Sequence, residues 1–256
     1  MSQPIILASN SPRRSQLLTQ AGVAFEKFVV EVDEPGLSEA YNGPLEQLGE
    51  YLAGEKALAA WRALGRSGLS SPLHGRGLES PLRDANGARR VLASDTTVLL
   101  AGRSLAKPED AAEAMAMLRE LRGREHTVAT GVALVDPARG EMLSATSATR
   151  VLMRDYSDDE IAAYVATGDP LDKAGSYSIQ HPGFQPVESL RGCHLGVIGL
   201  PICIVARLLG KDGAPDVTGA CPFSAQCTRP YPTEALVVHK RALPDVGGVD
   251  AAEAAG

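Results

Sequence analysis

The chain has 256 residues, a formal net charge of −6 at neutral pH, 44% hydrophobic residues and 22% charged residues. This composition is that of an ordinary globular protein, and the length allows one large α/β domain or two small ones. The acidic balance argues against a general nucleic-acid-binding protein, because neutralising phosphates along a nucleic acid requires a basic surface.

The first predicted elements are a short buried strand at residues 5–7 and a helix that begins at Ser11 and Pro12. Arg13 and Arg14 fall in the first turn of this helix, where the helix dipole disfavours cations. They suggest a phosphate or carboxylate ligand at the helix start. A solvated arginine pair on an ordinary strand–helix connection is the alternative from these residues alone.

A second strand is predicted over residues 25–32, and it ends at the acidic pair Asp33 and Glu34. This pair is either a set of metal or water ligands or an exposed turn before Pro35. Residues 44–64 have the apolar spacing of a helix, and Lys56 lies on it. Residues 65–90 are rich in Gly, Ser, Pro and Arg and have no period, which indicates a flexible surface insertion or, alternatively, a basic lid.

Residues 91–100 form an apolar strand that Asp95 interrupts. A carboxylate in such a strand is costly to bury unless it binds a cation or a hydrogen-bond donor, which favours a functional role. Lys107 opens the next helix, and residues 126–135 and 142–153 have the pattern of a β-hairpin. Ser157 and Glu160 form a capping box for a further helix.

A polar loop at residues 172–180 is expected to lead into a short strand, and a final helix is expected through residue 209. From residue 211 to residue 256 the period is lost, so we expect a largely disordered tail. The organisation is therefore one domain over residues 1–210 followed by this tail.

Membrane insertion and secretion are not expected. No segment approaches the apolar length that spans a membrane, and residues 1–20 lack the layout of a signal peptide. The four cysteines lie in the last quarter of the chain, which favours reduced thiols in a cytoplasmic protein.

The unusual polar residues suit chemistry at phosphorus. Such chemistry needs cations for the phosphate oxygens, carboxylates that hold Mg²⁺, and a base for the attacking water. The sequence offers all three types among Arg13, Arg14, Glu34, Lys56, Asp95, Lys107, Asp172 and Lys173. It has no GxxxxGKS loop, GxGxxG fingerprint or GxSxG elbow, which disfavours a P-loop NTPase, a Rossmann dehydrogenase and a serine hydrolase.

Several short motifs occur in one order along the chain: LASNSPRR, the acid pair DE, EK, ASDTTV, KP, GREHTVATGV, DKAGSYSIQ and GVIGLP. Together they closely resemble the Maf family of nucleotide pyrophosphatases, over residues 5–209 apart from the insertion. The resemblance implies an inosine-triphosphatase-like α/β fold, in which helices flank a mixed sheet and a central cleft separates two lobes. It also implies a homodimer, and hydrolysis of a nucleoside triphosphate to the monophosphate and pyrophosphate with Mg²⁺ or Mn²⁺.

The resemblance also implies roles for individual residues. Asp95 matches the proton acceptor for the attacking water, and Glu34 matches the metal-binding or water-positioning carboxylate, so Glu34 and Asp95 are the expected metal ligands. Lys56 and Lys107 match cations that contact the phosphates. Ser9 and Arg14 fall in the triphosphate-binding loop.

Substrate choice is implied in the same way. Arg13, Thr96 and Gln180 match the branch of the family that acts on dTTP and UTP, and on modified pyrimidines such as 5-methyl-UTP. The branch that acts on 7-methyl-GTP differs at the position of Thr96. Ser178 and His181 depart from the family pattern. The alternatives are a 7-methyl-GTP pyrophosphatase and a non-catalytic nucleotide-binding regulator of cell division.

Overall fold

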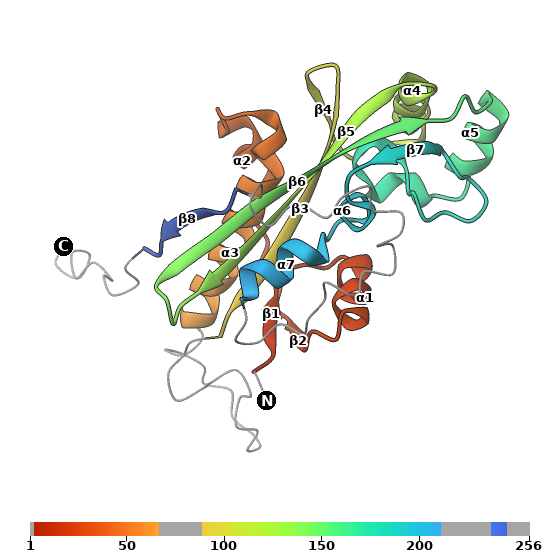
Figure 1. The fold of residues 1–256 in the computed structure, drawn as a ribbon. Coiled ribbons are helices and arrows are strands. Elements are labelled where there is room, and N and C mark those ends of the chain that lie inside the picture. Colours follow the sequence, from red (N-terminus) through yellow and green to blue (C-terminus); the bar gives the residue numbers. More distant parts are fainter. Residues whose placement is uncertain (1–2, 67–88, 211–236, 245–256) are drawn as a thin grey trace, which may run out of the picture.

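Three long strands form the centre of the molecule. The structure is a computed structural model that describes residues 3–66, 89–210 and 237–244. The long strands follow runs of apolar and β-branched residues and pair antiparallel: β3 (Val91–Leu100), β5 (Glu125–Asp136) and β6 (Glu141–Met153). Figure 1 shows them crossing the molecule side by side from one end to the other.

Shorter strands extend the sheet: β1 (Ile5–Leu7), β2 (Phe25–Lys27), β4 (Arg103–Leu105), β7 (Val187–Arg191) and β8 (His239–Ala242). The order is β2-β1-β3-β5-β6-β7, with β4 paired to β3 and β8 paired to β6. β1 runs parallel to β2 and β3, and the other pairs of described strands are antiparallel. The prediction of a mixed sheet is confirmed.

One edge of β3 is only partly covered. β1 pairs with it at Val91 and Leu92, and β4 pairs with it from Val98 to Leu100. Within the described ranges, no strand pairs with residues 93–97 along this edge. Asp95 and Thr96 therefore lie where the sheet is open on one side.

Helices cover both faces of the long strands: α1 (Pro12–Gln20), α2 (Glu34–Ala40), α3 (Leu48–Arg66), α4 (Ala111–Leu121), α5 (Asp158–Val165), α6 (His194–Ile198) and α7 (Ile202–Leu209). Single 3₁₀ turns lie at Leu45–Gln47, Asp169–Asp172 and Ala174–Ser176. Of the helices in the described residues, none is both long and apolar enough to cross a membrane.

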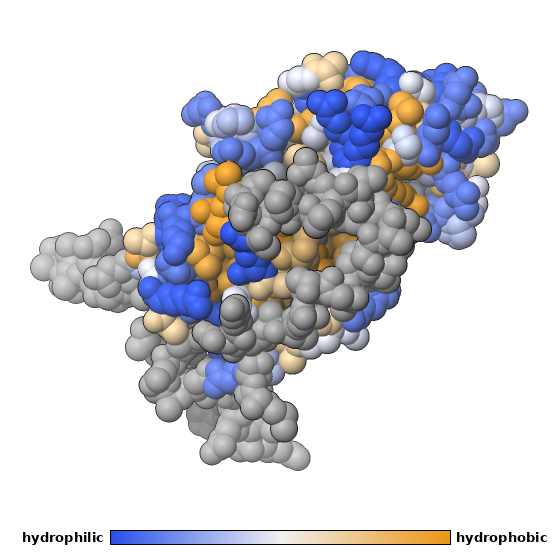
Figure 2. Space-filling model, viewed as in Figure 1, coloured by the Kyte–Doolittle hydropathy of each residue, from blue (hydrophilic) through white to orange (hydrophobic). Residues whose placement is uncertain are grey.

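Neighbouring side chains of β1 point to opposite faces of the sheet and show which helices cover each face. Ile6 packs with the apolar residues of α3, whereas Leu7 packs with those of α1 and α7. Figure 1 shows α3 and α7 on opposite sides of the long strands. A third cluster lies under α4 and α5. In Figure 2, on the face that bears α7, apolar residues gather in the middle and hydrophilic residues lie toward the ends.

Most predicted elements are confirmed. They include the strand before Pro12, the helix with Lys56, the strand with Asp95, the hairpin of β5 and β6, and the final helix α7. The capping box is also present, with Ser157 and Glu160 bonded to each other's backbone N–H groups.

Five local predictions differ from the structure. The helix expected to begin at Lys107 begins instead at Ala111, because the Asp110 carboxylate caps it there by accepting a hydrogen bond from the Glu113 N–H at 2.8 Å. The strand expected over residues 25–32 is only the three residues of β2. The turn at Asp33 is instead the start of α2, where the Asp33 carboxylate accepts a hydrogen bond from the Gly36 N–H at 3.0 Å. Ser11 precedes α1 but makes no side-chain capping bond. The strand expected directly after Gln180 begins only at Val187.

The prediction of a disordered tail is wrong for residues 237–244, because β8 pairs there with the start of β6. The buried carboxylate of Glu50 on α3 helps to hold this strand. It lies 2.5 Å from His239 Nδ1 on β8, and it accepts hydrogen bonds from Ser144 at 2.7 Å and Thr146 at 2.6 Å. The rest of the predicted tail lies outside the described residues.

The predicted insertion at residues 65–90 is too wide at both ends. Gly65 belongs to α3. The side chain of Arg89 is buried and donates to Pro4 O at 2.9 Å and to Glu26 Oε2 at 2.8 Å. Residues 67–88, on which the flexible-insertion and lid interpretations depend, lie outside the described residues.

Gly131 on β5 lets α3 approach the sheet closely. A Cβ on Gly131 would lie 2.1 Å from the backbone nitrogen of Glu50, so α3 would have to move. We expect Gly131→Ala to lower the free energy of unfolding by about 3 kcal/mol, measured by urea denaturation.

Gly65→Ala is the matched control, because among the described residues a Cβ there would meet no atom within 4 Å outside its own helix, and Gly65 lies in a helix. It should leave stability unchanged or raise it by about 0.5–1 kcal/mol. Equal stability of the two variants would contradict the close approach of α3.

Candidate active site

A cavity of about 1080 Å³ lies against the open edge of β3. Its lining comes from the loop after β1, the starts of α1 and α2, one side of α3, the middle of β3, residues 172–180 and the end of α6. All predicted site residues line it: Ser9, Arg13, Arg14, Glu34, Lys56, Asp95, Thr96, Lys107 and Gln180. The fold therefore brings together residues as far apart in the sequence as Ser9 and Gln180.

Lys56 joins the two predicted carboxylates. Its ammonium nitrogen lies 2.5 Å from Asp95 Oδ1 and 3.0 Å from Glu34 Oε2. The side chains of Lys56 and Asp95 are only 13% and 14% exposed, whereas that of Glu34 is 45% exposed. The cost of burying Asp95 in an apolar strand is thus offset by a direct ion pair.

The carboxylates of Glu34 and Asp95 suit a hard divalent cation that binds together with a phosphate group. Their oxygens are the type of ligand that Mg²⁺ prefers, and Mg²⁺ in proteins is often held by one or two carboxylates together with phosphates and water. Across the part of the chain that the structure describes, no group of three or more His, Cys, Asp or Glu side chains could hold a metal ion. The pair therefore fits a metal that arrives with a phosphate group.

Arg14 ties the loop after β1 to the turn between α6 and α7. Its Nε donates to Gly199 O at 3.0 Å, and its Nη1 donates to Ser9 Oγ at 3.1 Å. Ser9 Oγ also lies 3.3 Å from the Ser11 N–H, which donates to it. Burial lowers the pKa of Arg14, an effect that the negative charge of Asp95 opposes. Arg14 is thus bonded within the protein as well as lining the cavity.

Hydroxyls of the sheet bond to α6 and to the turn that follows it. The Ser94 hydroxyl shares its one proton between Gly131 O at 2.8 Å and Gly199 O at 2.9 Å, and Thr130 on β5 donates to Gly196 O of α6 at 2.7 Å. Thr96 Oγ1 lies 3.0 Å from Thr130 Oγ1. Thr130 was not among the predicted site residues, because a threonine in a strand gives no sign of its partner across the sheet.

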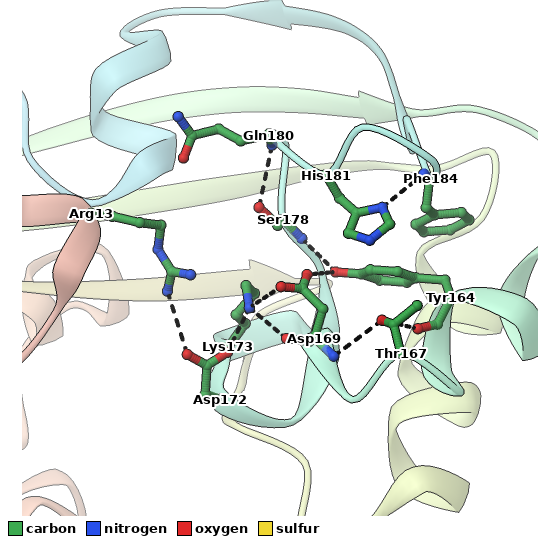
Figure 3. Close-up of polar contacts among 10 residues, drawn as sticks. All are labelled: Arg13, Tyr164, Thr167, Asp169, Asp172, Lys173, Ser178, Gln180, His181 and Phe184. Carbon is green, nitrogen blue, oxygen red and sulfur yellow. Dashed lines mark hydrogen bonds and ion pairs between the residues drawn. The ribbon is translucent and has the colours of Figure 1, made fainter. Parts of the chain in front are cut away.

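Arg13 faces the opposite wall of the cavity. Its Nη2 lies 4.0 Å from Asp172 Oδ2, as Figure 3 shows. Lys173 beside it is only 7% exposed, and its ammonium group donates to Asp169 O, Asp169 Oδ1 and Asp172 Oδ1. These bonds use all three protons of Lys173. Lys173 thus holds the turn at residues 169–173 together, whereas Arg13 remains partly exposed to the cavity.

The segment with Gln180 is held by aromatic residues (Figure 3). Tyr164 on α5 donates to Asp169 Oδ2 at 2.7 Å and accepts from the Ser178 N–H at 3.0 Å. Its ring stacks on Phe184 with centroids 4.4 Å apart. Burial raises the pKa of Tyr164, which keeps its hydroxyl proton available as a donor. Tyr164 was not among the predicted site residues.

The two departures from the family pattern have partners here. His181 Nδ1 accepts from the Phe184 N–H at 2.9 Å, and Ser178 Oγ accepts from the Gln180 N–H at 3.3 Å. Both bonds shape the segment that presents Gln180 to the cavity.

Lys107 is an exposed cation at the cavity wall. Its side chain makes no hydrogen bond or ion pair with any residue in the described ranges. Lys107 is therefore available to an anionic ligand, in contrast to Lys56 and Lys173.

Comparison with known proteins gives a consistent result. Residues 4–212 match the family model described as Maf-like protein. A dTTP/UTP pyrophosphatase of Thermomicrobium roseum is 42% identical over 231 residues, which cover 87% of this chain and 92% of that protein. Proteins of the same name from Pelotomaculum thermopropionicum and Aromatoleum aromaticum are each 41% identical, over 82% of this chain and 96% of their own length. The chain belongs to the Maf family.

Proposed function

We propose that the protein is a nucleoside triphosphate pyrophosphatase that acts on dTTP and UTP. The observation that supports this most directly is the cleft in which Lys56 joins Asp95 and Glu34 beside the open cations Lys107 and Arg13. Relatives about 40% identical over most of the chain are named for this activity.

In the proposed reaction, water attacks the α-phosphorus of the nucleotide and Asp95 accepts the proton of that water. The bond from the α-phosphorus to the oxygen that bridges to the β-phosphorus breaks, and pyrophosphate leaves with the electron pair. Lys56 holds the Asp95 carboxylate in position through the 2.5 Å contact. Lys107 offsets negative charge on the phosphate oxygens.

Glu34 and Asp95 would hold a divalent cation, Mg²⁺ or Mn²⁺, together with phosphate oxygens of the substrate. When bound, the cation would act as a Lewis acid that withdraws charge from the phosphate oxygens. Two carboxylates alone are too few to hold such an ion. The pair therefore suits a cation whose remaining ligands are oxygens of the bound nucleotide.

Base selection is proposed for Arg13, Thr96 and Gln180, which line the same cleft. Modified pyrimidine nucleotides such as 5-methyl-UTP would be further substrates, so that the enzyme removes them from the nucleotide pool. A 7-methyl-GTP pyrophosphatase and a non-catalytic regulator of cell division are the competing functions.

Pyrophosphate release from a panel of nucleotides tests the function. We expect dTTP, UTP and 5-methyl-UTP to be hydrolysed in preference to CTP, GTP and 7-methyl-GTP, with the monophosphate as the other product. Chelation of divalent metal should abolish the reaction, and Mg²⁺ or Mn²⁺ should restore it. Preference for 7-methyl-GTP would keep the chemistry and refute the specificity. No release by folded protein would favour the regulator.

Replacing the proposed base tests the mechanism. Asp95→Asn should lower kcat by about 10²–10⁴-fold, because an amide cannot accept the proton of the attacking water. Circular dichroism should show an unchanged fold. Asp155→Asn is the matched control, since Asp155 is exposed and does not line the cleft, and it should keep full activity. Near-normal activity of Asp95→Asn would remove Asp95 from the base role.

We also propose that the protein is a cytoplasmic homodimer, on the basis of the family resemblance. Light scattering during size-exclusion chromatography measures the mass in solution directly. Twice the chain mass of 26.8 kDa is the expected value, and a single chain mass would refute the dimer.

A further inference from the structure

We propose that Thr130 fixes the hydroxyl of Thr96 as a hydrogen-bond acceptor toward the cleft, and that this selects a pyrimidine base with a protonated N3. Thr130 would thus be a positioning residue for base selection that acts through Thr96. The inference rests on the proposed function, because it assumes that a pyrimidine nucleotide occupies this cleft.

The direction of the hydrogen bonds follows from counting protons. A threonine hydroxyl has one proton to donate and can accept two hydrogen bonds. Gly196 O can only accept, so the proton of Thr130 is directed to it, over 2.7 Å. Thr96 Oγ1 lies 3.0 Å from Thr130 Oγ1, and only Thr96 can supply the proton for this contact. The oxygen of Thr96 is then left with lone pairs alone.

Burial and the short bond to Gly196 favour this direction. Thr130 is 0% exposed and lies opposite Thr96 in the register of β3 and β5. If the Thr130 hydroxyl turned away, the buried carbonyl of Gly196 would lose the shorter of its two hydrogen bonds and keep only the one from the Gly199 N–H at 3.0 Å. Thr96 is partly exposed and lines the cavity, so its acceptor character is set before any ligand binds.

An acceptor with fixed direction distinguishes the pyrimidine bases. Uracil and thymine have an N–H at N3, which can donate to Thr96, whereas N3 of cytosine is itself an acceptor. A cytosine placed in the same way would bring two acceptors together without a proton between them. Sites that bind through an oriented hydrogen bond reject the unmatched analogue strongly, because the site's polar group is left unpaired.

The variant Thr130→Val tests this inference. Valine has the same branched shape but no proton, so the Thr96 hydroxyl becomes free to turn and to donate to cytosine. The ratio of kcat/KM for UTP to that for CTP should fall by at least about tenfold. Thr130→Ser, which keeps the hydroxyl, should retain the wild-type ratio.

Ser144→Ala is the matched control, because it also removes a buried hydroxyl of the sheet, one that donates to Glu50 and does not line the cleft. It should keep the wild-type ratio of UTP to CTP even if its melting temperature falls. An unchanged ratio in folded Thr130→Val would overturn the inference, as would an equal loss of selectivity in Ser144→Ala.

A substrate analogue gives a test that does not depend on the folding of Thr130→Val. The triphosphate of the 2-pyrimidinone ribonucleoside has an unprotonated N3 and no 4-amino group. The wild-type protein should hydrolyse it as poorly as CTP, and hydrolysis as fast as that of UTP would overturn the inference.

Nucleotide binding separates this inference from the proposed function. Calorimetry with the Asp95→Asn variant compares UTP and CTP without turnover. A preference for UTP that Thr130→Val removes would support the role of Thr130 even if the wild-type protein released no pyrophosphate. Hydrolysis of UTP without any preference over CTP would instead retain the function and overturn the inference.

Discussion

The bridge from Lys56 to Asp95 and Glu34 is the interaction on which the site depends. It joins a helix, the central strand and the start of a second helix, and it allows a carboxylate to lie within an apolar strand. Breaking such a pair from one side leaves an uncompensated charge, which is far more costly than the pair itself. The short distance between α3 and the sheet makes the bridge possible, and Gly131 permits that distance by having no side chain.

Helix α6 and the turn after it form a second part of the cleft that hydrogen bonds hold to the sheet. The carbonyls of Gly196 and Gly199 accept hydrogen bonds from Thr130, Ser94 and Arg14, which come from two strands and from the helix after β1. Both sides of the cleft are therefore held relative to the sheet before a ligand binds. The protein is acidic overall, so an anionic ligand depends on the few cationic side chains that are exposed to the cleft. Fixing the walls of the cleft keeps these side chains in a defined arrangement around the ligand.

The sequence predicted the members of the site better than their bonds. Asp95 was identified because burying a carboxylate in an apolar strand is costly unless it has a partner. Glu34 and Lys107 were identified through motifs that resemble those of one family. The sequence did not predict which groups Lys56 contacts, or that Thr130 bonds to Gly196. These contacts depend on how distant segments pack in the tertiary structure, and the local sequence pattern does not encode that packing. The start of α2 shows a different failure: its Asp cap and early proline were present in the sequence, but the segment is only seven residues long and has no buried residue to mark it.

The strand β8 shows that the fold extends past the segment by which the family is recognised. The family match ends at residue 212, yet residues 239–242 pair with residues 141–144 of β6. This pairing covers backbone groups at one end of a sheet edge, and an uncovered edge is a template for pairing with another molecule. A chain cut at the family boundary would keep every cleft residue but would expose this edge next to the buried carboxylate of Glu50. Strand β8 thus pairs with backbone groups of β6 that the described residues of the family segment leave unpaired.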